Sequence, residues 1–462
     1  MASSPINYYP ISIDEIIEKV SRKPRSRPET LDNIKSIVND FGEQITRVDG
    51  EIPPNLPVKN EDRFLFISYD QSVLSHGIHK YPAKFFPELP RWLISRYSNS
   101  GDIVLDPFAG SGTSNVEALL LGRHSVGIDV DPFSRYLIKV KTTPLSKKEL
   151  EQSKECLLRS IVNFKPEKVK DSDIPEFPYR DNWFNKEITL ELAYIKKKIL
   201  ELDVSQNVID FYLVCMSSII RAVSNADDNC TRTVIRKKLK KMVYPADALK
   251  RFTGRILLNI PKMIEFSGKV PTKIKIEYPD DQDARCLNNY KTGHFDLALT
   301  SPPYANAVDY PRTHQLELYW LGLVSGSLTP LKRQHVGTES VLLREYKELK
   351  KLHCKNADVA IAKIYKSDPR RAYIAYKYLD DMRKNLIEVH RVLRRGGRYV
   401  VVVGNNTIRG TIFESWKYLM DMAEVVGFDI ENYFGSEIIK HFIKVPRAER
   451  INTDWVLVLK KS

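Results

Sequence analysis

Cysteine is scarce in this sequence. The 462 residues hold five cysteines: Cys156, Cys215, Cys230, Cys286 and Cys354. No two of them stand at the spacing of a metal site, and scattered cysteines are typical of chains kept in a reducing compartment, so we expect no disulfide framework. His76 and His79 are three residues apart, but no carboxylate or thiol accompanies them to complete a ligand set. We therefore predict no metal site.

Long apolar runs are also missing. No stretch reaches the length that a membrane-spanning helix needs, and the first residues, Met1–Pro5, do not begin a signal peptide. From these features we expect a soluble cytoplasmic protein without a membrane partner.

Acidic residues are outnumbered by basic ones. The chain has 72 Lys and Arg against 58 Asp and Glu, a formal net charge of +14. Such an excess suits a polyanionic partner such as nucleic acid, which Lys and Arg bind through its phosphates. A basic, solvated surface without such a partner would give the same composition, so charge alone leaves both interpretations open.

One short stretch combines a strand, a glycine turn and a helix. The apolar run Ile103–Leu105 leads into eight residues: Asp106, Pro107, Phe108, Ala109, Gly110, Ser111, Gly112 and Thr113. A helical pattern follows, which predicts a buried parallel strand that enters a helix through a tight turn. The two glycines permit close approach of a ligand to the backbone, and the amides at the start of the helix face that ligand. Dinucleotide sites and ordinary loops use similar turns, so this stretch alone is weak evidence.

A second stretch lies nearly two hundred residues later. Phe295–Thr300 has the composition of another buried strand, and it ends in Ser301, Pro302, Pro303 and Tyr304. A proline turn that closes a strand would explain the prolines, but it would not explain the glycine turn upstream.

The two stretches together, DPFAGSGT and TSPPY, resemble the S-adenosylmethionine-dependent amino-methyltransferases of DNA. The resemblance covers most of residues 75–145 and 270–460, and the form that begins with serine is similar to the cytosine-N4 branch of the family. It implies an α/β, Rossmann-like class I methyltransferase fold with a mostly parallel seven-stranded sheet and a helical insertion. It also implies S-adenosylmethionine as cofactor, double-stranded DNA as substrate and a prokaryotic, nucleoid-associated enzyme.

The resemblance further implies where the cofactor binds. The predicted cofactor contacts, beyond the eight residues from Asp106 to Thr113, are Tyr81, Lys84, Phe85, Asp129, Asp283 and Thr300. Asp129 ends the predicted second strand, where a carboxylate accepts from both ribose hydroxyls. Asp131 is the alternative for this role, although it suits a helix cap better. Lys80 is an alternative to Lys84 for the cofactor carboxylate.

The serine-proline stretch carries the predicted catalytic residues, Ser301, Pro302, Pro303 and Tyr304. An exocyclic amine is a poor nucleophile because its lone pair is delocalised into the ring. The Ser301 hydroxyl and the Pro302 carbonyl can accept the hydrogens of the amine as it attacks the methyl group, and the prolines keep the loop stiff. Tyr304 can stack on a base that is flipped out of the duplex.

We divide the chain into four regions. They are an N-terminal helical extension (1–60), the cofactor half of the core (61–145), a helical basic insertion (146–272) and the catalytic half (273–462), which has a second insertion near 322–372. Within 1–60 we expect helices at Ser12–Val20 and near Thr30–Phe41. The late strands near Phe428–Tyr433 and Trp455–Lys460 would form an antiparallel edge pair.

Basic residues are dense in the helical insertion. The predicted DNA contacts are Arg232, Arg236, Lys237, Lys238, Lys240, Lys241, Asp309, Tyr310 and Arg312. A solvated helix surface is the alternative for the basic run. Whether residues 146–272 or 322–372 read the target sequence remains open.

The function we favour is transfer of a methyl group to the N4 amine of cytosine in duplex DNA, in a restriction-modification or defence system with an independently acting endonuclease. Adenine-N6 methylation is the near alternative; guanine-N2 methylation of RNA and an inactive nucleic-acid-binding protein are more distant. Cytosine-C5 chemistry requires a thiolate, commonly in a Pro-Cys pair, and no cysteine here follows a proline.

Overall fold

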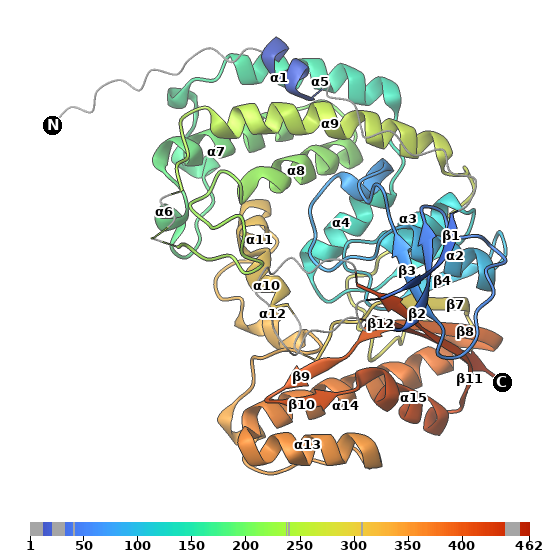
Figure 1. Cartoon of the computed structure of the whole chain (residues 1–462). Helices are drawn as coiled ribbons and strands as arrows, with labels where there is room; N and C mark the ends of the chain where they lie inside the picture. Colours follow the sequence, from blue (N-terminus) through green and yellow to red (C-terminus); the bar gives the residue numbers. More distant parts are fainter. Residues whose placement is uncertain are drawn as a thin grey trace.

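The computed structural model describes residues 13–20, 33–39, 42–236, 238, 241–305, 308–438 and 453–462. Within these residues one ten-stranded sheet forms the centre, in the order β1-β2-β3-β11-β12-β8-β7-β4-β5-β6 (Figure 1). Its strands are β1 (Ile34–Val38), β2 (Gln44–Asp49), β3 (Arg63–Ile67), β4 (Ile103–Asp106), β5 (His124–Gly127), β6 (Ile276–Glu277), β7 (Phe295–Thr300), β8 (Leu393–Gly404), β11 (Phe428–Glu437) and β12 (Thr453–Lys461). A separate hairpin joins β9 (Asn406–Ile408) to β10 (Thr411–Phe413).

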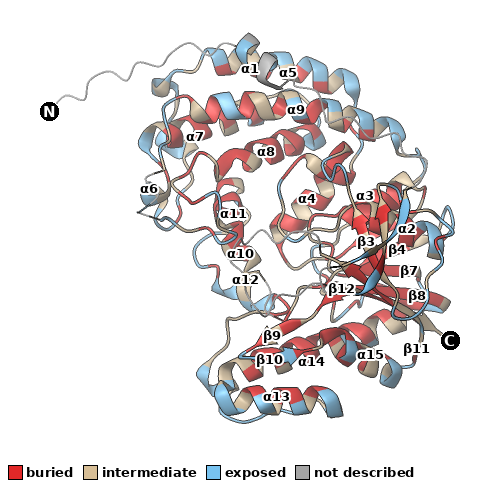
Figure 2. Cartoon of the chain, in the orientation of Figure 1, coloured by how far each residue is buried: buried red, intermediate tan, exposed pale blue. Residues whose placement is uncertain are grey.

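The sheet is buried on both faces. In β8, Val400 and Val402 pack into the apolar cluster on one face, whereas Val401 and Val403 pack into the cluster on the other. Successive strand residues point to opposite faces, so a run of four valines requires a covering layer on each side. Figure 2 shows the buried residues concentrated in the sheet and on the inward-facing sides of the helices, including those of the helical region.

Seven of the strands have the predicted class I arrangement. β6, β5, β4, β7 and β8 are parallel neighbours. β12 then inserts antiparallel between β8 and β11. This order confirms the Rossmann-like class I fold, in which ligands bind at the carboxyl ends of the parallel strands.

The N-terminal region differs from the prediction. α1 (Ile13–Val20) is helical as expected, but the helix expected near Thr30–Phe41 is wrong, because Ile34–Val38 forms β1. In β3 the side chains of Phe64 and Phe66 are buried in alternation, the period of a strand rather than a helix. Since β3 pairs with β11, the β11–β12 pair is not the edge of the sheet, which corrects a second expectation.

The predicted helical insertion is helical. It consists of α5 (Lys147–Val162), η2 (Pro166–Lys168), η3 (Asp171–Asp173), α6 (Arg180–Trp183), α7 (Lys186–Leu200), α8 (Gln206–Ile220) and α9 (Asp247–Lys269). The helices that precede it in the chain are η1 (Leu74–Gly77), α2 (Glu88–Tyr97), α3 (Thr113–Leu120) and α4 (Pro132–Thr142). The helices from α5 to α9 share one apolar core with α3 and α4, so they are fused to the sheet-side helices (Figure 1). The domain boundaries themselves remain a prediction.

The last three described helices, at residues 355–367, 369–392 and 415–426, cover the other face of the sheet, whereas the helix at 315–321 packs into the core of the helical insertion. β7 leads to α10 (Tyr310–Thr313), α11 (Gln315–Leu321), α12 (Thr329–Gln334), η5 (Leu343–Glu345), α13 (Lys355–Ser367) and α14 (Pro369–Val392), and α15 (Ser415–Val426) precedes β11. Ile361 and Ile364 of α13 are buried in the cluster of α14 and α15. The second insertion is therefore partly a structural layer. Among the described helices none is both long and apolar enough to cross a bilayer.

Candidate functional site

The tips of β4 and β7 are joined by a hydrogen bond. The Thr300 hydroxyl donates to Asp106 Oδ1 over 2.7 Å, and the amide of Phe108 donates to the same oxygen over 3.1 Å. Burial raises the pKa of Asp106 to about 6, although these donors favour its charged form. Two strands that are distant in sequence thus end at one point of the sheet edge.

The glycine turn adopts the backbone that its sequence requires. Gly110 and Gly112 have φ values of +51° and +76°, which disfavour a side chain. The Gly110 amide donates to Asp129 Oδ2 at the end of β5 over 2.9 Å, and the ring of Tyr81 lies over the turn. Burial, with the nearby charge of Asp131, raises the pKa of Asp129 to about 6. Asp131 caps α4 through the amide of Phe133, as its alternative role predicted.

A cleft with about 790 Å³ of empty space, open solvent included, lies over these strand ends. The predicted residues in its wall are Tyr81, Lys84, Phe85, Asp106, Pro107, Phe108, Ala109, Gly110, Ser111, Thr113, Asp129, Asp283, Ser301, Pro303 and Tyr310. Gly112, Thr300, Pro302 and Tyr304 are not in the wall. Most of the glycine turn thus shares one cleft with Ser301 and Pro303 of the serine-proline loop.

The segment before the glycine turn lies against this cavity. Tyr81 stacks on Tyr310 at 5.5 Å and on His314 at 5.0 Å, and its hydroxyl bonds to Ser134. The ammonium of Lys84 donates to the carbonyls of Gln71 and His76. Lys84 therefore lines the cavity while its charge is held by backbone carbonyls.

Sequence reasoning missed part of the wall. Arg285 lines the cavity and forms ion pairs with Asp283 at 2.6 Å and with Asp381 at 3.1 Å. Gln334, His335 and Val336 come from the second insertion, whose sequence carries no motif that would have indicated this role.

His335 connects the second insertion to the second strand. Its Nε2 lies 3.5 Å from Asp131 Oδ2, and its Nδ1 lies 2.9 Å from the carbonyl of Leu331. Burial alone would lower the pKa of His335, but the carboxylates of Asp131 and Asp129 outweigh it, and the pKa lies above its ordinary value.

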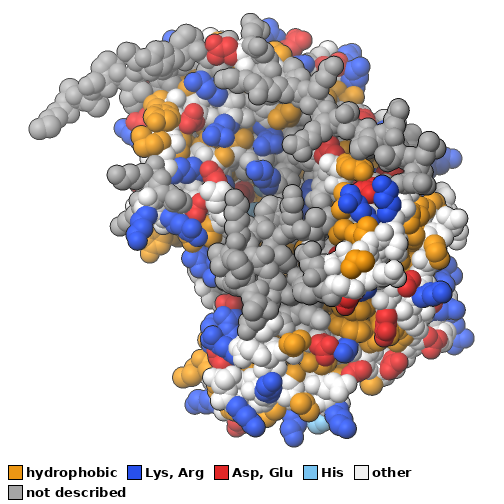
Figure 3. All heavy atoms as spheres, viewed as in Figure 1, with side chains coloured by type: hydrophobic (Ala, Val, Ile, Leu, Met, Phe, Trp, Pro, Cys, Tyr) orange, Lys and Arg blue, Asp and Glu red, His pale blue; other side chains and the backbone are white. Residues whose placement is uncertain are grey.

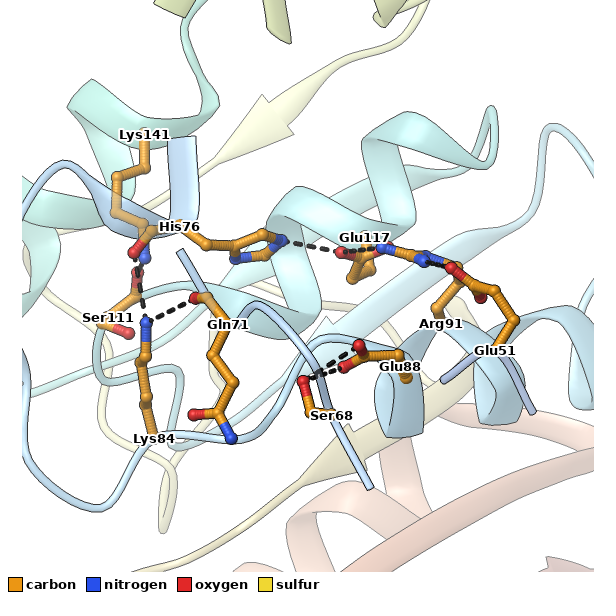
Figure 4. Close-up of polar contacts among 10 residues, drawn as sticks. All are labelled: Glu51, Ser68, Gln71, His76, Lys84, Glu88, Arg91, Ser111, Glu117 and Lys141. Atoms are coloured by element: carbon orange, nitrogen blue, oxygen red, sulfur yellow. Dashed lines mark hydrogen bonds and ion pairs between the residues drawn. The ribbon is translucent and has the colours of Figure 1, made fainter. Parts of the chain in front are cut away.

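A buried ion-pair network supports the helix behind the turn (Figure 4). Glu117 of α3 accepts from His76 Nε2 at 2.7 Å and from Arg91 Nε at 2.7 Å, and Arg91 also reaches Glu51. Burial holds the pKa of His76 below its usual value, so the neutral ring donates its Nε2 hydrogen. Burial opposes ionisation of Glu117, but the hydrogen bonds from His76 and Arg91 prevail and lower its pKa.

The predicted DNA contacts differ in their exposure to solvent and in whether they pair with other residues of the chain. Arg232 and Lys238 are exposed, and Arg236, also exposed, pairs with Asp227 at 3.2 Å. The ammonium of Lys241 donates to the carbonyls of Arg221 and Ala226 and to Asp228, which indicates a structural role.

The remaining predicted contacts near α10 have internal partners. Asp309 caps α10 and pairs with Lys332 at 2.9 Å, and Arg312 is half-buried. Lys237 and Lys240 lie outside the described residues. The described part of the chain contains no group of three potential ligands that would hold a metal ion.

The cavity wall offers unpartnered polar groups to a ligand. Ser111 Oγ and Thr113 Oγ1 are buried in it without a hydrogen-bond partner in the structure. Buried hydroxyls of this kind are normally satisfied, so a ligand that offers polar atoms would complete them. Gly110 lies in the wall without a side chain, so the ligand can approach the backbone there.

Comparisons with known proteins find similarity to DNA methylases. A family of DNA methylases matches residues 7–140. The chain is 26% identical over 377 residues to Type II methyltransferase M.MvaI of Kocuria varians, covering 76% of this chain and 82% of that protein. It is 26% identical over 340 residues to Type II methyltransferase M.BsoBI of Geobacillus stearothermophilus, covering 68% of this chain and 66% of that protein.

Among solved structures the chain is similar to a putative DNA modification methylase from Thermus thermophilus, complexed with S-adenosyl-L-methionine. The identity is 19%, the coverage 39% of this chain and 53% of that one, and the TM-score 0.22.

The sheet order and the cleft at its carboxyl edge define a class I methyltransferase. The family match and the two curated relatives support an S-adenosylmethionine-dependent DNA amino-methyltransferase. The chain is an S-adenosylmethionine-dependent DNA methyltransferase, as the paired motifs predicted.

The ion-pair network predicts a large loss of stability on replacement of Glu117. Glu117→Ala leaves Arg91 and His76 without their buried partner, and we expect the free energy of unfolding to fall by about 3–5 kcal/mol, measured by urea denaturation. Glu265→Ala is the control, because the Lys269–Glu265 pair is exposed and its loss is worth at most about 0.5 kcal/mol. Equal losses in the two variants would contradict the role of the network.

The His335–Asp131 contact predicts a pH-dependent contribution to stability. Because the pKa of His335 is raised in the folded state, the contribution is fully present below about pH 6.5, the unfolded value, and is lost as pH rises through the folded value. We expect the stability difference between wild type and His335→Gln, from urea midpoints, to shrink between pH 6 and pH 8.5. A constant difference would show that the imidazolium does not stabilise this wall.

Proposed function

We propose that the chain methylates the exocyclic N4 amine of cytosine in duplex DNA. The observation that carries the proposal is the position of Ser301 and Pro303 in the wall of the cavity that the glycine turn also lines. Their strand is tied to the cofactor strand through Thr300 and Asp106. A donor bound on the turn and an amine held at Ser301 would therefore meet in one cleft.

The cofactor half of the cleft supplies binding and orientation. S-adenosylmethionine, when bound, supplies a methyl group activated by a positively charged sulfur. In the proposal Asp129 accepts from the ribose hydroxyls, and Asp283, held by Arg285, lies at the adenine end. The unpartnered hydroxyls of Ser111 and Thr113 bind polar atoms of the same ligand.

The serine-proline loop orients the amine. The Ser301 hydroxyl and the Pro302 carbonyl accept the two amine hydrogens, which turns the nitrogen lone pair toward the methyl group. Pro302 and Pro303 have fixed φ angles, so these acceptors stay in place without an ordering cost during the reaction. Adenine-N6 methyltransferases of the family that this chain resembles usually have Asp or Asn at the position of Ser301. The serine found here therefore supports cytosine as the target.

The DNA partner would be held by basic side chains of the helical region. Arg232, Arg236, Lys238, Lys250 and Arg251 are exposed there. Figure 3 shows Lys and Arg side chains over the helical region and over the lower part of the same face, with acidic residues between them. Phosphate contacts from such residues position the duplex and make binding depend on salt concentration.

Both curated relatives carry the name Type II methyltransferase. On that similarity we propose that the chain acts in a restriction-modification system, with a separate endonuclease that acts on the same target sequence. Adenine-N6 methylation is the competing activity, because it uses the same attack geometry.

The product identifies the base. Incubation of the full chain with labelled S-adenosylmethionine and plasmid DNA should label the DNA, and nucleoside analysis by mass spectrometry should give N4-methyldeoxycytidine. A dominant N6-methyldeoxyadenosine peak would assign the adenine branch instead. Structured RNA serves as the control substrate and should remain unlabelled.

Replacement of Tyr304 tests the stacking role. Tyr304→Ala should lower kcat about 5- to 150-fold, because stacking of a base on an aromatic ring is worth about 1–3 kcal/mol. The affinity for S-adenosylmethionine, measured by calorimetry, should stay unchanged, since Tyr304 is outside the cavity wall. Tyr433→Ala on β11 is the matched control and should leave kcat intact. A parallel loss of cofactor affinity in Tyr304→Ala would refute the role.

A further inference from the structure

The Tyr304 side chain forms a hydrogen bond to a strand that is distant in sequence. Its hydroxyl donates to Asp454 Oδ1 of β12 over 2.7 Å. Within the described part of the chain, no other group donates a hydrogen bond to the Asp454 side chain. Both residues are half-buried.

Gly404 makes this contact possible. It ends β8 and lies directly opposite Asp454 in the antiparallel register of β8 and β12. A Cβ at position 404 would lie 2.8 Å from Asp454 Oδ1 and 3.0 Å from the Tyr304 ring, closer than side chains tolerate. The Asp454 carboxylate and the Tyr304 ring therefore both pack against the backbone of Gly404, which has no side chain.

The Tyr304 hydroxyl favours the charged form of this carboxylate. Burial raises the pKa of Asp454 to about 6, and the hydrogen bond from Tyr304 opposes that rise. A hydrogen bond from a hydroxyl to a carboxylate is shorter and about twice as strong as a neutral one. The hydroxyl lies on the long axis of the ring, so this bond limits the swing of the whole side chain.

We propose that Asp454 is a positioning residue for methyl transfer, which holds Tyr304 by its hydroxyl and so fixes the ring on which the flipped target base stacks. The inference rests on the proposed function, because it assigns the stacking surface to Tyr304. A ring that is already fixed loses no freedom when the base arrives, and the amine is then held at a constant distance from the donor.

A double-mutant cycle tests the coupling of the two residues. Asp454→Ala removes the acceptor and Tyr304→Phe removes the donor while it keeps the ring. Each should lower kcat for plasmid DNA about tenfold, and the double variant should be no slower than the slower single variant, because both remove one bond. The Kd for S-adenosylmethionine should stay unchanged, which a general structural defect would not allow.

Tyr433→Phe is the matched control. The Tyr433 hydroxyl also donates to a carboxylate, Glu61, at 3.0 Å, but from β11 outside the cleft. This variant should keep the wild-type kcat. If Asp454→Ala fails to fold, Asp454→Asn replaces it, since the amide keeps the shape and a weaker, neutral acceptor, and kcat should then fall by a smaller factor.

The outcomes separate the two proposals. Absence of methyl transfer to DNA by the wild type overturns the proposed function and this inference with it. If the wild type methylates DNA, but Asp454 variants keep full kcat or their losses multiply with that of Tyr304→Phe, the proposed function stands and the positioning role is overturned.

Discussion

The hydrogen bond between Thr300 and Asp106 is the constraint on which the site depends. It joins the tips of β4 and β7, so the glycine turn and the serine-proline loop leave the sheet from one point. Its 2.7 Å length and burial mean that neither tip can move without leaving a polar atom unsatisfied. The relative position of donor and acceptor sites is therefore set by the sheet and not by the loops.

The turn is also supported from behind. The ammonium of Lys141 is buried and donates to the carbonyl of Ser111 over 2.6 Å, while the Glu117 network holds the helix that the turn begins. Burial keeps the pKa of Lys141 well below its ordinary value. The two glycines alone would leave the backbone of the turn flexible, and these contacts hold it in one conformation. The turn is therefore made rigid by side chains that lie outside the cavity wall.

Local signals predicted the core of the site. The strand-turn-helix pattern at Asp106–Thr113 and the strand ending at Thr300 are visible because residue type and spacing specify them directly. The N-terminal strands were missed, since Ile34–Val38 is too short for a period to be decisive and its strand state depends on pairing with β2. His335 and Asp454 were missed for a related reason. Each reaches the site only through tertiary packing, and the residues beside it in sequence carry no motif.

The three N-terminal strands have a consequence for the outer edge of the sheet. Without β3, the backbone of β11 would present unpaired amides and carbonyls to another molecule, which is the usual route to intermolecular strand pairing. With them, the outermost strand is β1, five residues long with Lys35 and Ser36 exposed. Because β1 is only five residues long and carries an exposed lysine, it offers a foreign strand fewer pairing groups than β11 would, although its Ile34 and Val38 are exposed as well.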